Sequence, residues 1–126
     1  MSLRVLIIDD EPTVRRNLAA YLEDEDMNVR SVSSGEDAVE LIRQGLAFDV
    51  CVVDMRLPGM NGDETIRALY ALCPRLQFLI HTGTADYSPP ERLVAVGVKR
   101  DRVFRKPLPD MGPLAAAVRG LGAEHG

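Results

Sequence analysis

Two stretches of sequence decide the fold, Leu3-Arg-Val-Leu-Ile-Ile-Asp-Asp10 and Asp49-Val-Cys-Val-Val-Asp54. In each, an apolar run stops at acidic side chains, as a buried strand does where it gives way to a loop. Strands that are apolar throughout are typical of a parallel sheet covered on both faces. Because all strands of such a sheet point the same way, we expect the carboxylates of Asp9, Asp10 and Asp54 to converge at one edge.

The rest of the chain alternates strand and helix patterns. Short apolar runs predict strands at 3–8, 29–32, 50–53 and 76–81, and a short polar run predicts a fifth strand at the sheet edge at 102–105. Apolar residues at helical spacing, opened by signals such as Pro12, Ser34 and Asn61, predict helices at 12–22, 34–42, 61–72, 89–97 and 109–121. These five strand–helix units predict an α/β fold, a doubly wound parallel five-stranded sheet. We expect one domain at 1–122 and a frayed tail at 123–126.

The composition argues against several classes of protein. A length of 126 residues suits one domain. The net charge of −4 and the pI near 5.1 argue against direct nucleic-acid binding, which usually needs a basic surface. No apolar run approaches the roughly 20 residues that span a bilayer, and the start does not read as a secretion signal. Cys51 and Cys73 form no Cys-x-x-Cys pair, so we expect inert thiols in a reducing cytoplasm.

Further polar residues follow the later strands, with Thr82 after the fourth and Lys106 after the fifth. In open α/β sheets, ligands bind beyond the carboxyl ends of the strands. A carboxylate there can accept a phosphoryl group as an acyl phosphate. Asp10 and Asp54 can hold Mg²⁺, and Lys106 with the Thr82 hydroxyl can hold phosphoryl oxygens. The sequence therefore predicts a metal-assisted phosphoryl-transfer site.

Four fragments stand in order on these strands: Asp9-Asp10, Val52-Val-Asp-Met-Arg-Leu-Pro-Gly-Met-Asn-Gly62, Thr82-Gly83 and Lys106-Pro107. In this combination the chain resembles the receiver domain of two-component response regulators, in particular the chemotaxis-regulator type. The resemblance covers nearly the whole chain. It implies a flavodoxin-like (βα)5 fold with strand order 2-1-3-4-5.

The resemblance also implies a role for each acidic residue. Asp54 would be the phospho-acceptor, receiving its phosphoryl group from a sensor histidine kinase or a histidine phosphotransfer protein. Asp10 would ligate Mg²⁺ directly, Asp9 would act mainly through water, and the backbone carbonyl of Arg56 would be a further ligand. Mn²⁺ is the alternative ion.

Two more residues take their roles from the resemblance. Lys106 would contact the phosphoryl group and precede a cis peptide bond at Pro107, and Thr82 would move toward the phosphoryl group. The face made by the fourth helix, fifth strand and fifth helix would then meet a downstream effector or output domain, or a second copy in a phosphorylation-dependent homodimer. Such a domain is a switch that assists its own phosphorylation and dephosphorylation, not an enzyme acting on a separate substrate.

Two features depart from the usual receiver pattern. The position three residues before the lysine, usually aromatic, is Val103, while Phe104 is expected on the opposite face of the strand. The segment 97–106 is also longer than the usual connection. In addition, His81 precedes Thr82, and strand alternation turns it away from the site. We expect His81 to be a core histidine with satisfied hydrogen bonds.

Two other functions are consistent with parts of the sequence. A phosphorylation-independent receiver-like interaction module is favoured by Val103 and opposed by the complete acidic set. A phosphohydrolase of the haloacid-dehalogenase type usually carries an Asp two residues after its nucleophile, where this chain has Arg56. The sequence does not name the cognate kinase, the lifetime of the phosphoryl group or the oligomeric state. Nor does it tell a free-standing switch from a part of a longer regulator or hybrid kinase.

Overall fold

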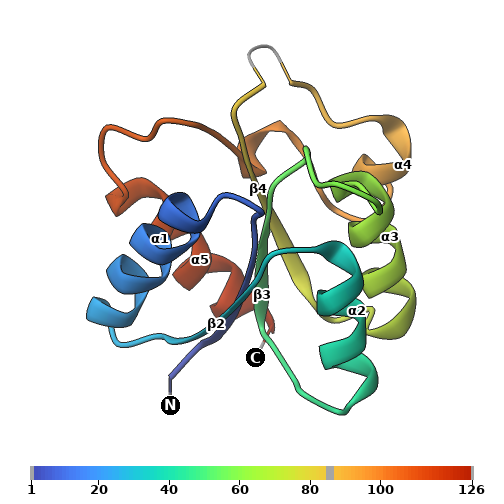
Figure 1. Ribbon diagram of the computed structural model, residues 1–126, viewed down its shortest axis with the longest axis horizontal. Coiled ribbons are helices and arrows are strands. Elements are labelled where there is room, and N and C mark those ends of the chain that lie inside the picture. Colours follow the sequence, from blue (N-terminus) through green and yellow to red (C-terminus); the bar gives the residue numbers. More distant parts are fainter. Residues whose placement is uncertain (1, 85–86, 126) are drawn as a thin grey trace.

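The computed structural model describes residues 2–84 and 87–125, in which strands and helices alternate along the chain (Figure 1). The strands are β1 (Arg4–Ile8), β2 (Asn28–Val32), β3 (Val50–Val53), β4 (Gln77–Thr82) and β5 (Val103–Arg105). The helices are α1 (Pro12–Asp24), α2 (Gly35–Arg43), α3 (Gly62–Leu72), α4 (Glu91–Val94), the short 3₁₀ helix η1 (Arg100–Arg102) and α5 (Gly112–His125).

The five strands form one parallel sheet in the order β2-β1-β3-β4-β5, which confirms the predicted fold. Ile8 lies opposite both Val32 and Val53, so three strands end at the same level. The ladder continues one residue further, because the Asp9 N–H donates to the Val32 carbonyl (3.2 Å) and the Asp54 N–H to the Ile8 carbonyl (2.9 Å). This register brings the two aspartates to one edge of the sheet.

Helices cover both faces of the sheet, with α1 and α5 on one side and α2, α3 and α4 on the other (Figure 1). Alternate residues of each strand pack against opposite helices, as the strand period of two requires. The face toward α1 and α5 buries Val5, Ile7, Val50, Val52 and Leu79. The opposite face buries Leu6, Ile8, Cys51, Val53, Phe78 and Ile80. The sheet is thus packed on both faces, and its carboxyl edge positions the side chains that follow the strands.

The helix starts follow the predicted capping signals. The Ser34 hydroxyl accepts a hydrogen bond from the Asp37 N–H at 3.0 Å. Asn61 and Glu64 form a reciprocal capping box, with bonds of 2.8 and 3.1 Å. Such caps satisfy backbone donors that have no partner inside the helix. The second cap fixes the start of α3, directly after the loop that leaves β3.

Several boundaries differ from the sequence-based prediction, most of them by one or two residues and those of α4 and α5 by more. Helix α4 ends at Val94 rather than 97, because the chain reverses at Gly97 with a left-handed φ of 95°. Strand β5 starts at Val103, since η1 takes up the preceding residues. Helix α5 starts at Gly112 and continues to His125, so it includes residues 123–125 that we expected to form a frayed tail. Within the described part of the chain, none of the helices is both long and apolar enough to cross a membrane.

Candidate functional site

A largely buried lysine lies between two buried aspartates at the carboxyl edge of the sheet. Lys106 Nζ lies 2.8 Å from Asp9 Oδ2 and 3.2 Å from Asp54 Oδ2. The side chains of Asp9, Asp54 and Lys106 are 3%, 4% and 11% exposed. The structure therefore brings together three of the residues that the sequence predicted for the site, one from the end of each of β1, β3 and β5.

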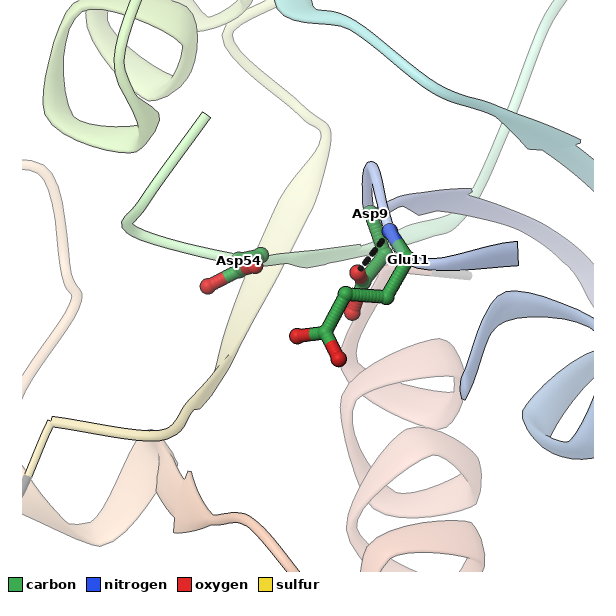
Figure 2. A group of neighbouring side chains, drawn as sticks. All are labelled: Asp9, Glu11 and Asp54. Carbon is green, nitrogen blue, oxygen red and sulfur yellow. Dashed lines mark hydrogen bonds between the residues drawn. The ribbon is translucent and has the colours of Figure 1, made fainter. Parts of the chain in front are cut away.

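Glu11 completes the acidic cluster, and the sequence analysis missed it. Oxygen atoms of Asp9, Glu11 and Asp54 all lie within 4.8 Å of one another. Figure 2 shows Asp9 and Glu11 together after β1, with Asp54 across from them at the end of β3. The Glu11 N–H donates to Asp9 Oδ1 (2.9 Å), and its carboxylate lies 3.2 Å from Lys106 Nζ. The signal in the sequence that could have identified Glu11 was its position, directly after the aspartate pair and before Pro12.

Two predicted metal ligands are not part of the carboxylate cluster formed by Asp9, Glu11 and Asp54. Asp10 is exposed and does not belong to this group of carboxylates among the described residues. The backbone N–H of Arg56 donates to Asp54 Oδ1 at 3.1 Å, so Arg56 lies beside the acceptor through its main chain. The metal-ligand roles of Asp10 and of the Arg56 carbonyl stay predictions.

Thr82 is fully buried at the end of β4. Its hydroxyl accepts a hydrogen bond from the Thr84 N–H at 3.3 Å. Backbone pairing fixes it relative to the site, because the Lys106 N–H donates to the Thr82 carbonyl at 2.8 Å. The peptide bond from Lys106 to Pro107 is cis, as predicted. A direct role of the Thr82 hydroxyl toward a phosphoryl group stays a prediction.

Burial and the surrounding charges shift two pKa values in this cluster. Burial raises the pKa of Asp54, against the opposing effects of the Arg56 N–H and the Lys106 charge. Burial alone would lower the pKa of Lys106, but its hydrogen bond to Asp9 and the charges of Asp54 and Asp9 raise it overall. One ammonium thus faces three carboxylates, an excess of negative charge carried entirely by oxygen donors. Such a donor set fits a hard divalent cation such as Mg²⁺.

We predict that Asp54→Asn raises the melting temperature of the metal-free protein near pH 7. The folded-state pKa of Asp54 lies above its unfolded value, so its ionised form destabilises the fold at neutral pH. This destabilisation disappears as the pH falls through the folded-state pKa and below the ordinary value of 3.8. Thermal melts in EDTA across that range should show the gap between the two proteins closing at low pH. An unchanged or lower melting temperature near pH 7 would contradict it, with Asp101→Asn as the exposed control.

The structure corrects one expectation about His81. It is 3% exposed, as expected for a core residue. However, neither ring nitrogen has a hydrogen-bond partner within the described part of the chain, so the prediction of a satisfied histidine was wrong. By contrast, Val103 packs on the α2–α4 side and Phe104 on the α1–α5 side, which confirms that they occupy opposite faces of β5.

Comparisons with known proteins agree with this architecture. Residues 5–119 match the family model of the response regulator receiver domain. A cyclic di-GMP phosphodiesterase from Thermotoga maritima is 32% identical over 106 residues, which cover 84% of this chain and 27% of that protein. The chain spans less than half the length of the first curated relatives that it matches.

Solved structures show the same fold. A response regulator receiver domain protein from Methanospirillum hungatei JF-1 has a TM-score of 0.84 at 23% identity and covers 99% of this chain and 97% of that one. The response regulator TrrA from Thermotoga maritima, solved in complex with Mg²⁺ and BeF, has a TM-score of 0.82 at 23% identity and covers 94% and 98%. With the family match over residues 5–119 and the acidic cluster at the carboxyl edge of a 2-1-3-4-5 sheet, the chain belongs to the receiver domain family of response regulators.

Proposed function

We propose that Asp54 is the phospho-acceptor of this receiver domain, and that its phosphorylation depends on Mg²⁺. The observation that carries the proposal is the burial of the Asp54 carboxylate beside Lys106, at 3.2 Å, within the cluster that includes Asp9 and Glu11. A buried nucleophile next to a fixed ammonium needs little rearrangement to stabilise a transferring phosphoryl group.

The transfer forms one bond and breaks another. An oxygen of the Asp54 carboxylate attacks phosphorus, and the bond between phosphorus and the donor's leaving atom breaks. The Arg56 N–H, already bonded to Asp54 Oδ1, holds the carboxylate so that Oδ2 faces Lys106. Lys106 then contacts the phosphoryl oxygens, and Thr82 reports the new charge by moving toward it.

The residues around Asp54 can also hold the cation. Asp9, Asp10, Asp54 and the Arg56 carbonyl would bind Mg²⁺, with Mn²⁺ as an alternative, and Glu11 lies close enough to add an oxygen. Bound there, the ion offsets the negative charge that gathers during transfer. The relative TrrA, described as a complex with Mg²⁺ and BeF, supports this assignment.

The partners follow from the role of a receiver. The phosphoryl donor would be a sensor histidine kinase or a histidine phosphotransfer protein, and a downstream effector or output domain would read the α4–β5–α5 face. The domain, residues 1–122, would act in the cytoplasm as a switch that catalyses only its own modification. The curated relatives are longer than this chain, so the activities that their names give need not be shared here.

The test is incubation with acetyl phosphate, with and without Mg²⁺, followed by intact-mass spectrometry. We expect a phosphoryl adduct that requires Mg²⁺, is absent in Asp54→Ala and persists in Asp101→Ala, which removes an exposed carboxylate. An adduct in Asp54→Ala would place the acceptor elsewhere. No adduct in a folded wild-type protein that binds Mg²⁺ would favour the phosphorylation-independent module, which Val103 also favours.

A further inference from the structure

Glu11 is the exposed member of an otherwise buried acidic cluster. Its side chain is 59% exposed, whereas the side chains of Asp9 and Asp54 are 3% and 4% exposed. The Glu11 carboxylate lies 3.2 Å from Lys106 Nζ, and oxygen atoms of Glu11 and Asp54 lie within 4.8 Å of each other (Figure 2). A negative charge is therefore in contact with solvent and close to the proposed phospho-acceptor.

The Glu11 carboxylate is held in this place by two contacts. Glu11 is the residue that precedes α1, and its own N–H donates to Asp9 Oδ1 at 2.9 Å. Its carboxylate is paired with Lys106. An exposed glutamate without such contacts would spread its charge over many rotamers. Here the backbone and the ion pair together keep the charge beside Asp54.

The charges around Asp54 leave a negative surplus. Four carboxylates belong to this part of the molecule, those of Asp9, Asp10, Glu11 and Asp54. A divalent cation and the Lys106 ammonium would supply three positive charges, so one negative charge remains, and without Glu11 none would. A small phosphoryl donor such as acetyl phosphate is a dianion near neutral pH. To react with Asp54, its phosphoryl group must come within a few ångströms of the Glu11 carboxylate, where like charges repel each other.

We propose that Glu11 selects against small, free anionic phosphoryl donors and so insulates Asp54 from acyl phosphates that no protein delivers. A phosphoryl group carried by a protein arrives with many other contacts that offset the repulsion, whereas a small dianion makes few. Repulsion of an unwanted ligand is a common source of specificity. This inference rests on the proposed phosphorylation of Asp54 and concerns the class of donor that reaches it.

The first test compares how fast acetyl phosphate forms the adduct in wild type and in Glu11→Gln. Each protein is measured at saturating Mg²⁺, with its own Mg²⁺ affinity determined by calorimetry. A single and a double negative charge about 6 Å apart in water predict a reaction about fivefold faster in the variant at ~20 mM ionic strength. At ~1 M salt, where screening removes the repulsion, the two rates should converge. Glu23→Gln changes the net charge equally at an exposed position of α1 and should react like wild type.

Glu11→Asp separates the charge from the shape of the side chain. It keeps the carboxylate and should stay as slow as wild type, so a rate equal to that of Glu11→Gln would overturn the proposal. Equal rates of wild type and Glu11→Gln at low salt would also overturn it. So would a faster rate of Glu11→Gln that persists at ~1 M salt, because a screened charge has little reach there and the effect would come from releasing Lys106.

The second test requires no phosphorylation. Inorganic phosphate, largely a dianion near pH 8, is titrated in the presence of Mg²⁺ while the amide resonance of Arg56, which donates to Asp54 Oδ1, is followed by NMR. Glu11→Gln should bind phosphate about fivefold more tightly than wild type at low ionic strength. Equal dissociation constants, or no binding by the variant, would overturn the proposal whether or not Asp54 accepts a phosphoryl group. A missing adduct in wild type, by contrast, would count against the proposed function alone.

Discussion

Lys106→Met should lower the free energy of unfolding by about 3 kcal/mol when no divalent cation is present, because removing one partner of a buried ion pair leaves the other charge uncompensated. Methionine keeps an extended side chain but removes the ammonium that lies 2.8 Å from Asp9 and 3.2 Å from both Glu11 and Asp54. Urea denaturation in EDTA measures the loss. Lys99→Met, at an exposed position, is the control and should change stability little.

Magnesium should restore part of the stability that Lys106→Met removes. A divalent cation among Asp9, Glu11 and Asp54 replaces the missing positive charge, so Mg²⁺ should stabilise the variant more than it stabilises the wild type. The comparison needs only denaturation curves with EDTA and with saturating Mg²⁺. If the variant lost less than about 1 kcal/mol in EDTA, the value typical of an exposed ion pair, the lysine would not be neutralising a desolvated cluster.

Gly62→Ala should lower the free energy of unfolding by about 2–3 kcal/mol, the usual cost of forcing extra volume into a packed site. A Cβ at Gly62 would lie 2.5 Å from the Asp54 carbonyl oxygen and 2.6 Å from the Met55 Cα. These are backbone atoms, so no change of rotamer relieves both contacts. The loop after β3 would have to shift, which should also slow phosphorylation of Asp54 by acetyl phosphate.

Gly120→Ala is the matched control for this substitution. Gly120 lies within α5, and a Cβ there would meet nothing within 4 Å. Alanine should therefore stabilise the protein by about 0.5–1 kcal/mol, because glycine is the poorer residue inside a helix. Urea denaturation of both variants measures these changes in the free energy of unfolding. Equal stability of Gly62→Ala and wild type would mean that the β3–α3 loop moves away without cost.

The parts of the site that could be predicted are those fixed by strand ends. Asp9, Asp54 and Lys106 come together because parallel strands place their carboxyl ends at one edge, and the apolar runs before them mark those strands. Glu11 could not be placed this way. Its side chain direction depends on how the loop turns into α1, including the bond from its own N–H to Asp9.

The environment of His81 shows the same limit. The burial of His81 was predicted correctly, but the absence of partners for its nitrogens among the described residues was not, and its position beside a cavity that Glu11 and Lys106 also line does not confirm that it turns away from the acidic site. Whether such partners exist depends on which side chains reach it from α1 and from the β5–α5 segment, both far away in the sequence. The length of α4 was predicted wrongly for a related reason. The chain reverses at Gly97, and this reversal returns Val98 to the core, where it is fully buried.

Asp9, Asp54 and Lys106 come from the first, middle and last parts of the chain, and Lys106 is 52 residues away from the acceptor that it contacts. A chain still emerging from the ribosome, or one cleaved before β5, carries Asp54 without the lysine that neutralises it. Competence for phosphorylation would therefore arise only after synthesis of the last strand. In the cell, the modification would be restricted to molecules in which β5 has been made, and neither shorter nascent chains nor fragments that lack β5 would compete for the phosphoryl donor.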